Sequence, residues 1–182
     1  MIKGFPITPR VVITSGAAQL LEQLAERHGP VMFHQSGGCC DGSSPMCYPV
    51  GDFIVGDRDV LLGVLDTGDG AGAGVPVWIS GPQFQAWKHT QLVIDVVPGR
   101  GGGFSLEAPE GMRFLSRGRA FSDAENTALA ATPVITGADY ARGERPADRA
   151  PVVASENWRA DVCSVPATRP TVRDVKAGTP GK

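Results

Sequence analysis

Hydrophobic residues recur at helical spacing in a single segment near the start of the chain. Ala17, Leu21 and Leu24 lie three or four positions apart, with charged and polar residues between them. Thr14 is a favourable N-cap, and Gly29, followed by proline, is a typical helix terminator. The pattern therefore predicts an amphipathic helix between these two residues.

Most of the remaining hydrophobic pattern is typical of short strands separated by Gly- and Pro-rich turns. A second, shorter helix is expected from Ser80 to about His89, because Ser80 and Gln83 match a capping box with Pro82 in the first turn. The fold class predicted is α+β, with a mixed, mostly antiparallel β-sheet system and two short helices. The expected strands are Val11–Ile13, Val31–Phe33, Asp52–Val55, Asp59–Val64, Val75–Ile79, Leu92–Val97, Phe104–Leu106 and Met112–Arg117.

Beyond about residue 125 the hydrophobic periodicity fades, while alanine, proline, arginine and aspartate become more frequent. We therefore predict an α+β domain over residues 1–125. Residues 126–182 are expected to be an extended C-terminal tail of low order that could dock on a partner.

Charge and hydropathy exclude several classes of function. With 17 basic and 19 acidic residues the net charge is −2, which gives no reason to expect nucleic acid or an anionic membrane as partner. The sequence has no apolar run of transmembrane length and does not begin like a signal peptide. We therefore expect a cytoplasmic protein, in which cysteines stay reduced and serve metal or redox chemistry before structural disulfides.

The chemistry is concentrated in one stretch after the second expected strand. Cys39, Cys40 and Cys47 fall within nine positions, beside His34 and Asp41. Thiolates favour zinc, copper(I) or iron–sulfur clusters, and the glycines between these residues allow a short loop to turn several side chains toward one point. The spacing therefore predicts a metal site with the three cysteines as ligands and His34 or Asp41 as an auxiliary ligand. Three thiolates leave a four-coordinate metal one ligand short, and His89, Cys163 or a cysteine of a second subunit could also complete it.

Other interpretations of the same stretch remain open. The cysteines could be small buried hydrophobic residues that stabilise the loop. Cys39 or Cys40 could instead be a nucleophile activated by His34 or by loop amides. The chain has no Ser-His-Asp or Cys-His-Asn signature of a known hydrolase family, and we expect a protein without enzymatic activity.

Four motifs carry a resemblance to a known family over roughly residues 10–122. They are His34–Gly42, Pro45–Tyr48, His89–Gln91 and Gly101–Glu107. These motifs resemble a bacterial family called domain of unknown function 779. The family is often associated with aldehyde dehydrogenase genes, so the resemblance implies an aldehyde dehydrogenase as a possible partner.

A more distant resemblance is to the A-type iron–sulfur carriers, the HesB/IscA-like fold. The loop Gly37–Gly42 is similar to their Gly-Gly-Cys-x-Gly loop, and Ile94–Val97 and Gly103–Leu106 match two later segments. The carriers then have a Cys-Gly-Cys pair where this chain has Leu115–Arg119, so only their first cysteine position is present. The resemblance implies a HesB-like fold and a possible homo-oligomer.

The sequence thus favours a small metal- or iron–sulfur-binding accessory protein that serves a partner enzyme. The alternatives are a non-catalytic scaffold subunit whose tail binds a partner enzyme, and a thiol-dependent redox enzyme. The metal would be zinc or iron, as a single ion or a cluster.

Overall fold

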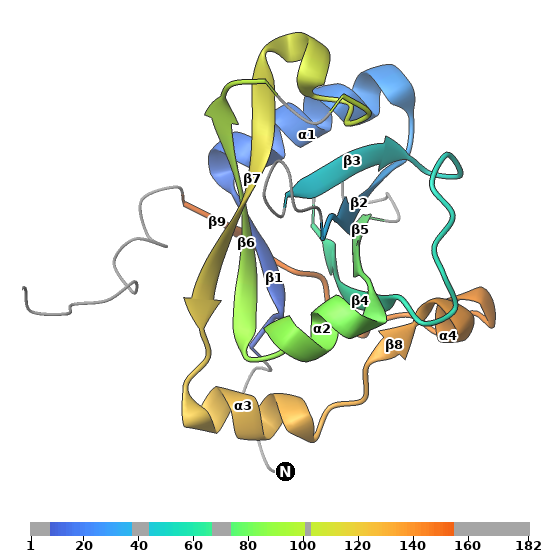
Figure 1. Ribbon diagram of the computed structural model, residues 1–182, viewed down its shortest axis with the longest axis vertical. Coiled ribbons are helices and arrows are strands. Elements are labelled where there is room, and N and C mark those ends of the chain that lie inside the picture. The colour runs from blue at the N-terminus through green and yellow to red at the C-terminus, as the bar shows by residue number, and fades with distance from the viewer. Residues whose placement is uncertain (1–7, 38–43, 67–73, 101–102, 155–182) are drawn as a thin grey trace, which may run out of the picture.

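The computed structural model describes residues 8–37, 44–66, 74–100 and 103–154. Within these ranges it has an α+β architecture of two mixed sheets and a few short helices, which confirms the predicted fold class (Figure 1). The helices are α1 (Ser15–His28), α2 (Gly81–Trp87), α3 (Asp123–Ala130) and α4 (Gly137–Ala141), with a 3-10 turn at Ala108–Glu110. The strands are β1 (Val11–Thr14), β2 (Val31–Gln35), β3 (Pro45–Pro49), β4 (Val60–Leu65), β5 (Val75–Ile79), β6 (Thr90–Pro98), β7 (Met112–Ala120), β8 (Ile135–Thr136) and β9 (Val152–Val153).

The strands form one sheet of order β7-β6-β1-β9 and another of order β3-β2-β5-β4-β8. Three of the strand pairs are parallel, namely β1 with β6, β1 with β9 and β2 with β5. The pairs β2–β3, β4–β5, β4–β8 and β6–β7 are antiparallel. The expected mixture with an antiparallel majority is therefore present.

The main hydrophobic core joins both sheets and α1. Leu21 and Leu24 of α1 are fully buried in it, together with residues of β1, β2, β4, β5, β6 and β7. Phe33 of β2 and Phe114 of β7 meet edge to face with ring centroids 4.9 Å apart, which ties the two sheets together. The N-cap predicted for α1 is confirmed, because the Thr14 hydroxyl accepts a hydrogen bond from the Ala17 amide.

Two expected strands are absent from the described residues, and three observed strands, β3, β8 and β9, were not expected. Residues 52–55 lie in the connection between β3 and β4, where Phe53 packs on Tyr48 rather than joining a sheet. Residues 104–106 lie in the connection between β6 and β7, where the buried Ser105 hydroxyl accepts a hydrogen bond from the Cys47 amide. The half-buried Phe53 and the buried Ser105 each make contacts through a single side chain, so hydrophobicity alone predicted the wrong structure for both segments.

Residues 126–154 do not form the low-order tail that the sequence predicted. The expected boundary at residue 125 falls inside α3, which has a complete capping box between Ser122 and Glu125. Further along, β8 pairs with β4 and β9 pairs with β1, so this segment adds an edge strand to each sheet. Strands of two residues have no measurable periodicity, which is why the pattern missed them. Residues 155–182 lie outside the described part of the chain.

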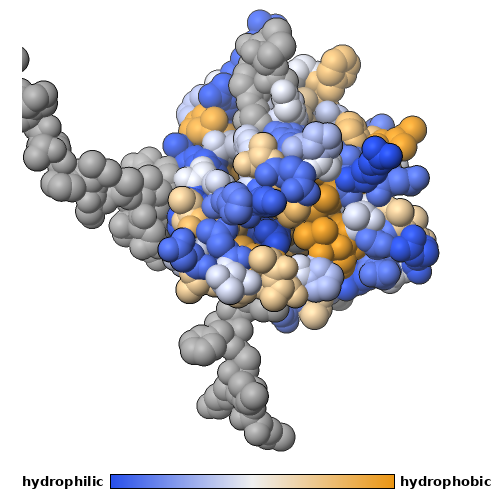
Figure 2. Space-filling view, turned by 60° about the horizontal axis from the view of Figure 1, so that its bottom comes forward, coloured by the Kyte–Doolittle hydropathy of each residue, from blue (hydrophilic) through white to orange (hydrophobic). Residues whose placement is uncertain are grey.

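No helix within the described ranges is long and apolar enough to cross a membrane. Figure 2 shows the molecule with the bottom of the Figure 1 view turned forward. This face is mostly polar, with a modest hydrophobic patch near its centre.

Candidate functional site

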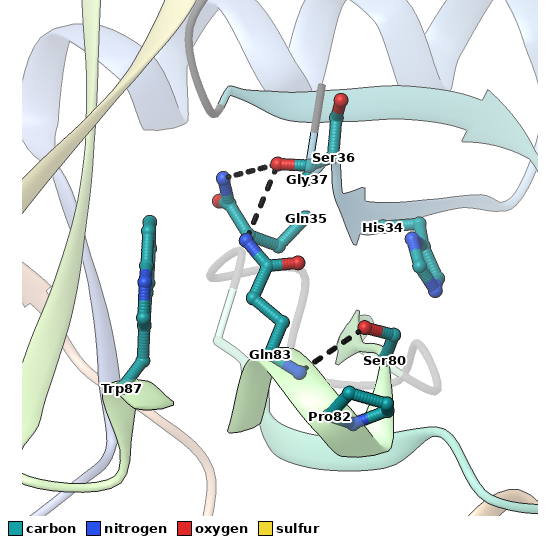
Figure 3. A pocket seen from close by; sticks show the side chains of 8 residues that line it. All are labelled: His34, Gln35, Ser36, Gly37, Ser80, Pro82, Gln83 and Trp87. Carbon is teal, nitrogen blue, oxygen red and sulfur yellow. Dashed lines mark hydrogen bonds between the residues drawn. The ribbon is translucent and has the colours of Figure 1, made fainter. Parts of the chain in front are cut away.

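An open groove of about 490 Å³ lies where β2 ends, next to α2 (Figure 3). One side consists of His34, Gln35, Ser36 and Gly37, and the other of Ser80, Pro82, Gln83 and Trp87. In Figure 3, Trp87 and His34 stand at opposite ends, with the two glutamines between them. Among the described residues, none that lines the groove is Lys, Arg, Asp or Glu, and those that do line it offer amides, hydroxyls, one imidazole and one indole.

Hydrogen bonds to the Ser36 carbonyl fix the end of β2. The side-chain amides of Gln35 and Gln83 both donate to this oxygen at 3.3 Å. The Ser36 amide donates to the Ser44 carbonyl at 2.8 Å, so the two residues that flank the segment 38–43 are held together. Gln35 is fully buried and also accepts from the Ser116 hydroxyl at 2.8 Å. The end of β2 is therefore anchored to β7 through Gln35 and to α2 through Ser36.

His34 is oriented by a carboxylate from a distant part of the chain. Its Nε2 lies 3.2 Å from Oδ2 of Asp59, and both side chains are more than four-fifths buried. A carboxylate can only accept, so Nε2 carries the hydrogen, and in a neutral imidazole Nδ1 then keeps the lone pair. The imidazole also packs on the Phe53 ring in a tilted arrangement, with ring centroids 4.4 Å apart. The Asp59 carboxylate in turn accepts a hydrogen bond from the Gly56 amide at 2.9 Å. His34 is thus held in one tautomer and one orientation at the rim of the groove.

Cys47 lies in the hydrophobic core and not at the groove. It is fully buried on β3 and is paired with Phe33 of β2, so these two side chains share the core face of the sheet. His34 is the next residue along β2 and therefore points to the opposite face. Burial raises the pKa of the Cys47 thiol strongly, and the nearby Glu107 carboxylate adds to this effect. Cys47 is consequently a thiol in the native protein at neutral pH, whereas a metal ligand must be a thiolate.

The five predicted metal ligands are thus only partly placed by the structure. His34 and Cys47 are not brought together, whereas Cys39, Cys40 and Asp41 lie outside the described residues. Within residues 8–37, 44–66, 74–100 and 103–154, no group of three or more His, Cys, Asp or Glu side chains is arranged to hold a metal ion.

Sequence reasoning missed three residues that shape this region. Asp59 follows His34 by 25 positions, and no local pattern connects them. Gln83 was assigned only to a helix cap, although its side chain also reaches Ser36. Glu107 is 2% exposed, with burial raising its pKa, and it accepts hydrogen bonds from the Ser105 hydroxyl and the Phe114 amide. An acidic residue within a Gly-rich connection gave no signal of burial.

Fold and groove together define a small α+β protein with a polar groove at the end of a strand that leads into a cysteine pair. Residues 20–120 match the family described as Domain of unknown function (DUF779), and the chain belongs to this family. No curated protein and no solved structure matches the chain. The HesB/IscA-like fold therefore stays a prediction.

Proposed function

We propose that this DUF779 protein is a metal- or iron–sulfur-binding accessory protein whose ligands are Cys39, Cys40 and His34, with Asp41 as an auxiliary ligand. One observation carries the proposal: the His34–Asp59 pair lies at the rim of the groove, on the strand that leads into Cys39 and Cys40. The bound group would be a zinc or iron ion, or an iron–sulfur cluster.

The environment of His34 suits a metal ligand. A histidine that binds a metal almost always donates its other ring N–H to a carboxylate or carbonyl, which fixes the tautomer and increases ligand basicity. Asp59 provides this support, and Nδ1 of His34 forms no hydrogen bond with a described residue. Only four residues lie between His34 and Cys39 in the sequence, so few residues separate the imidazole from the two thiols.

Cys47 does not belong to the proposed ligand set. We leave it out because it is buried among apolar residues and lies on the other face of the sheet from His34, whereas spacing alone predicted it as a ligand. Two thiolates, one imidazole and one carboxylate would provide four donors, which is the number that a tetrahedral zinc or iron site requires. The metal would supply either a structural link or a transferable ion.

The partner that we propose is an aldehyde dehydrogenase, on the basis of the gene association implied for the family. A cytoplasmic location belongs to the same proposal, because free thiolate ligands persist in a reducing compartment. Homo-oligomerisation stays a prediction. Co-purification of the chain with a purified aldehyde dehydrogenase, with and without metal, tests the partner separately from the metal.

Metal analysis tests the central proposal. The protein is purified without oxygen, its zinc and iron are quantified per chain, and its visible spectrum is recorded before and after reconstitution. We expect about one site per chain in the wild type, and loss of the metal in Cys39→Ala and Cys40→Ala. Cys47→Ala and Cys163→Ala are the matched controls and should keep it. A wild type without metal after reconstitution would refute the proposal.

A thiol-dependent enzyme is the second candidate function, because an Asp–His pair can also serve a nucleophile. Asp59 would orient His34, and His34 would take the proton from Cys39 or Cys40 as general base. The rate of iodoacetamide labelling against pH distinguishes the two functions in metal-free protein. A thiol that reacts rapidly below pH 7, and more slowly in His34→Ala, would favour the enzyme. Ordinary thiol reactivity in the metal-free protein, together with a metal found in the purified protein, would favour the accessory protein.

A further inference from the structure

The outer edge of β7 has backbone groups that no described residue binds. β7 is nine residues long, and its other edge pairs with β6 along its whole length. The Phe114 amide points away from β6, since it donates to the Glu107 carboxylate. Because backbone groups alternate along a strand, the amides of Ser116, Gly118 and Ala120 point outward too. Among the described residues, none accepts a hydrogen bond from these three amides.

This edge is also accessible. Gly118 and Ala120 are exposed, and Ser116 is half-buried. An unpaired strand edge is a template for a further strand, and proteins usually protect such edges with charge, bulges or covering segments. Within the described part of the chain, only the Glu107 carboxylate caps this edge, at Phe114.

A row of arginines on β7 determines what can pair with it. Arg113, Arg117 and Arg119 occupy odd positions and therefore lie on one face of the strand. Arg117 binds Asp95 at 2.7 Å and Arg119 binds Glu125 at 2.8 Å, whereas Arg113 forms no ion pair with a described residue. In an antiparallel pair of two β7 strands, every register that pairs at least two of Ser116, Gly118 and Ala120 with the same set in the other copy places arginines opposite each other. Like charges that face each other across strands destabilise the pair, so the edge disfavours a second copy of itself.

We propose that β7 is a docking edge for an extended, acidic segment of a partner protein, which adds to the sheet as a fifth strand beside β7. Main-chain hydrogen bonds to Ser116, Gly118 and Ala120 would provide affinity, as in other cases of strand addition. An acidic side chain of the partner would face Arg113, which forms no ion pair with a described residue, and would provide selectivity. The inference is independent of the metal site, because no proposed metal ligand lies on β7.

A set of synthetic peptides tests this proposal with the full-length protein. The probe is a fluorescent nine-residue peptide that alternates glutamate with valine and threonine, and its binding is measured by anisotropy. One control replaces glutamate by lysine, and another is N-methylated throughout and cannot form the ladder. We expect the glutamate peptide to bind about 2–30-fold more tightly than the lysine peptide, from about 0.2–1 kcal/mol each for the attraction of glutamate and the repulsion of lysine at Arg113. The N-methylated peptide should not bind.

Hydrogen exchange and a charge reversal locate the binding to β7. The glutamate peptide should slow exchange of the Ser116 and Gly118 amides, and Arg113→Glu should reverse the preference between the glutamate and lysine peptides. Arg58→Glu, at an exposed arginine in the connection between β3 and β4, is the matched control and should have no effect. Equal binding of all three peptides, unchanged exchange at both amides, or self-association through β7 would each overturn the proposal.

Discussion

Replacement of Cys47 by alanine separates a structural cysteine from a metal ligand. The side chain is 0% exposed and packs in the main core, with Phe33 directly opposite on β2. The substitution removes one sulfur atom and leaves a small cavity, which should lower the free energy of unfolding by about 1–2 kcal/mol. For a chain of this size that corresponds to a decrease of about 2–8 °C in melting temperature.

Two measurements on the same variant test this reasoning. Thermal and urea unfolding should show the loss of stability, while the metal content per chain should equal that of the wild type. In native wild-type protein, Cys47 should react very slowly with iodoacetamide at neutral pH, because burial keeps it a protonated thiol, and it should react rapidly in urea. Cys163→Ala should change neither stability nor metal content. Loss of metal from Cys47→Ala, without a comparable loss in the other controls, would refute a purely structural role.

Three further substitutions give distinct results. Asp59→Asn keeps an acceptor for Gly56 but weakens the support of His34, so metal affinity should fall about 10–100-fold in a competition titration with a chelator. Glu107→Gln should raise the stability at pH 7, because burial raises the pKa of Glu107 above its ordinary 4.5 and ionisation therefore opposes folding as pH rises. Asp95→Asn should instead lower the stability at pH 7. Burial alone would raise the pKa of Asp95, but hydrogen bonds, led by the one from Arg117, lower it below the ordinary 3.8. The Asp95 carboxylate therefore stabilises the fold above pH 3.8, and this contribution disappears as the pH falls.

Each of these substitutions has its own contradicting outcome. Unchanged metal affinity in Asp59→Asn, or an equal loss in the neighbouring Asp57→Asn, would mean that Asp59 does not act through His34. For Glu107→Gln, the difference in unfolding free energy from the wild type should grow between pH 4.5 and 7, and a constant difference would contradict the raised pKa. For Asp95→Asn, the loss of unfolding free energy relative to the wild type should shrink toward pH 3. A loss that is independent of pH would contradict the lowered pKa of Asp95.

The parts of the fold that local patterns specify were predicted well from the sequence. β5 was predicted with its observed bounds, Val75–Ile79, because a run of apolar residues is flanked by turns. The cap and the apolar face of α1 were likewise evident from spacing alone. In these segments the information that selects the structure lies within about ten residues.

The parts that depend on distant partners were not predicted. The Cys47 position seemed equivalent to the positions of Cys39 and Cys40, but antiparallel pairing of β3 with β2 buries its side chain in the core. The contact between Asp59 and His34 depends on the β3–β4 connection and has no local signature. Edge strands such as β9 are too short to carry periodicity, so the sequence predicts a tail where the structure has them.

The ligands around the bound metal provide the most direct test of the central claim. X-ray absorption spectra at the zinc or iron edge would be recorded on anaerobically purified protein with the additional substitution Cys163→Ser. The account predicts two sulfur neighbours near about 2.3 Å and one imidazole nitrogen near about 2.0 Å for zinc, with the nitrogen signal lost in His34→Ala. Three sulfur neighbours from one chain, or a metal site that keeps its nitrogen signal in His34→Ala, would contradict it.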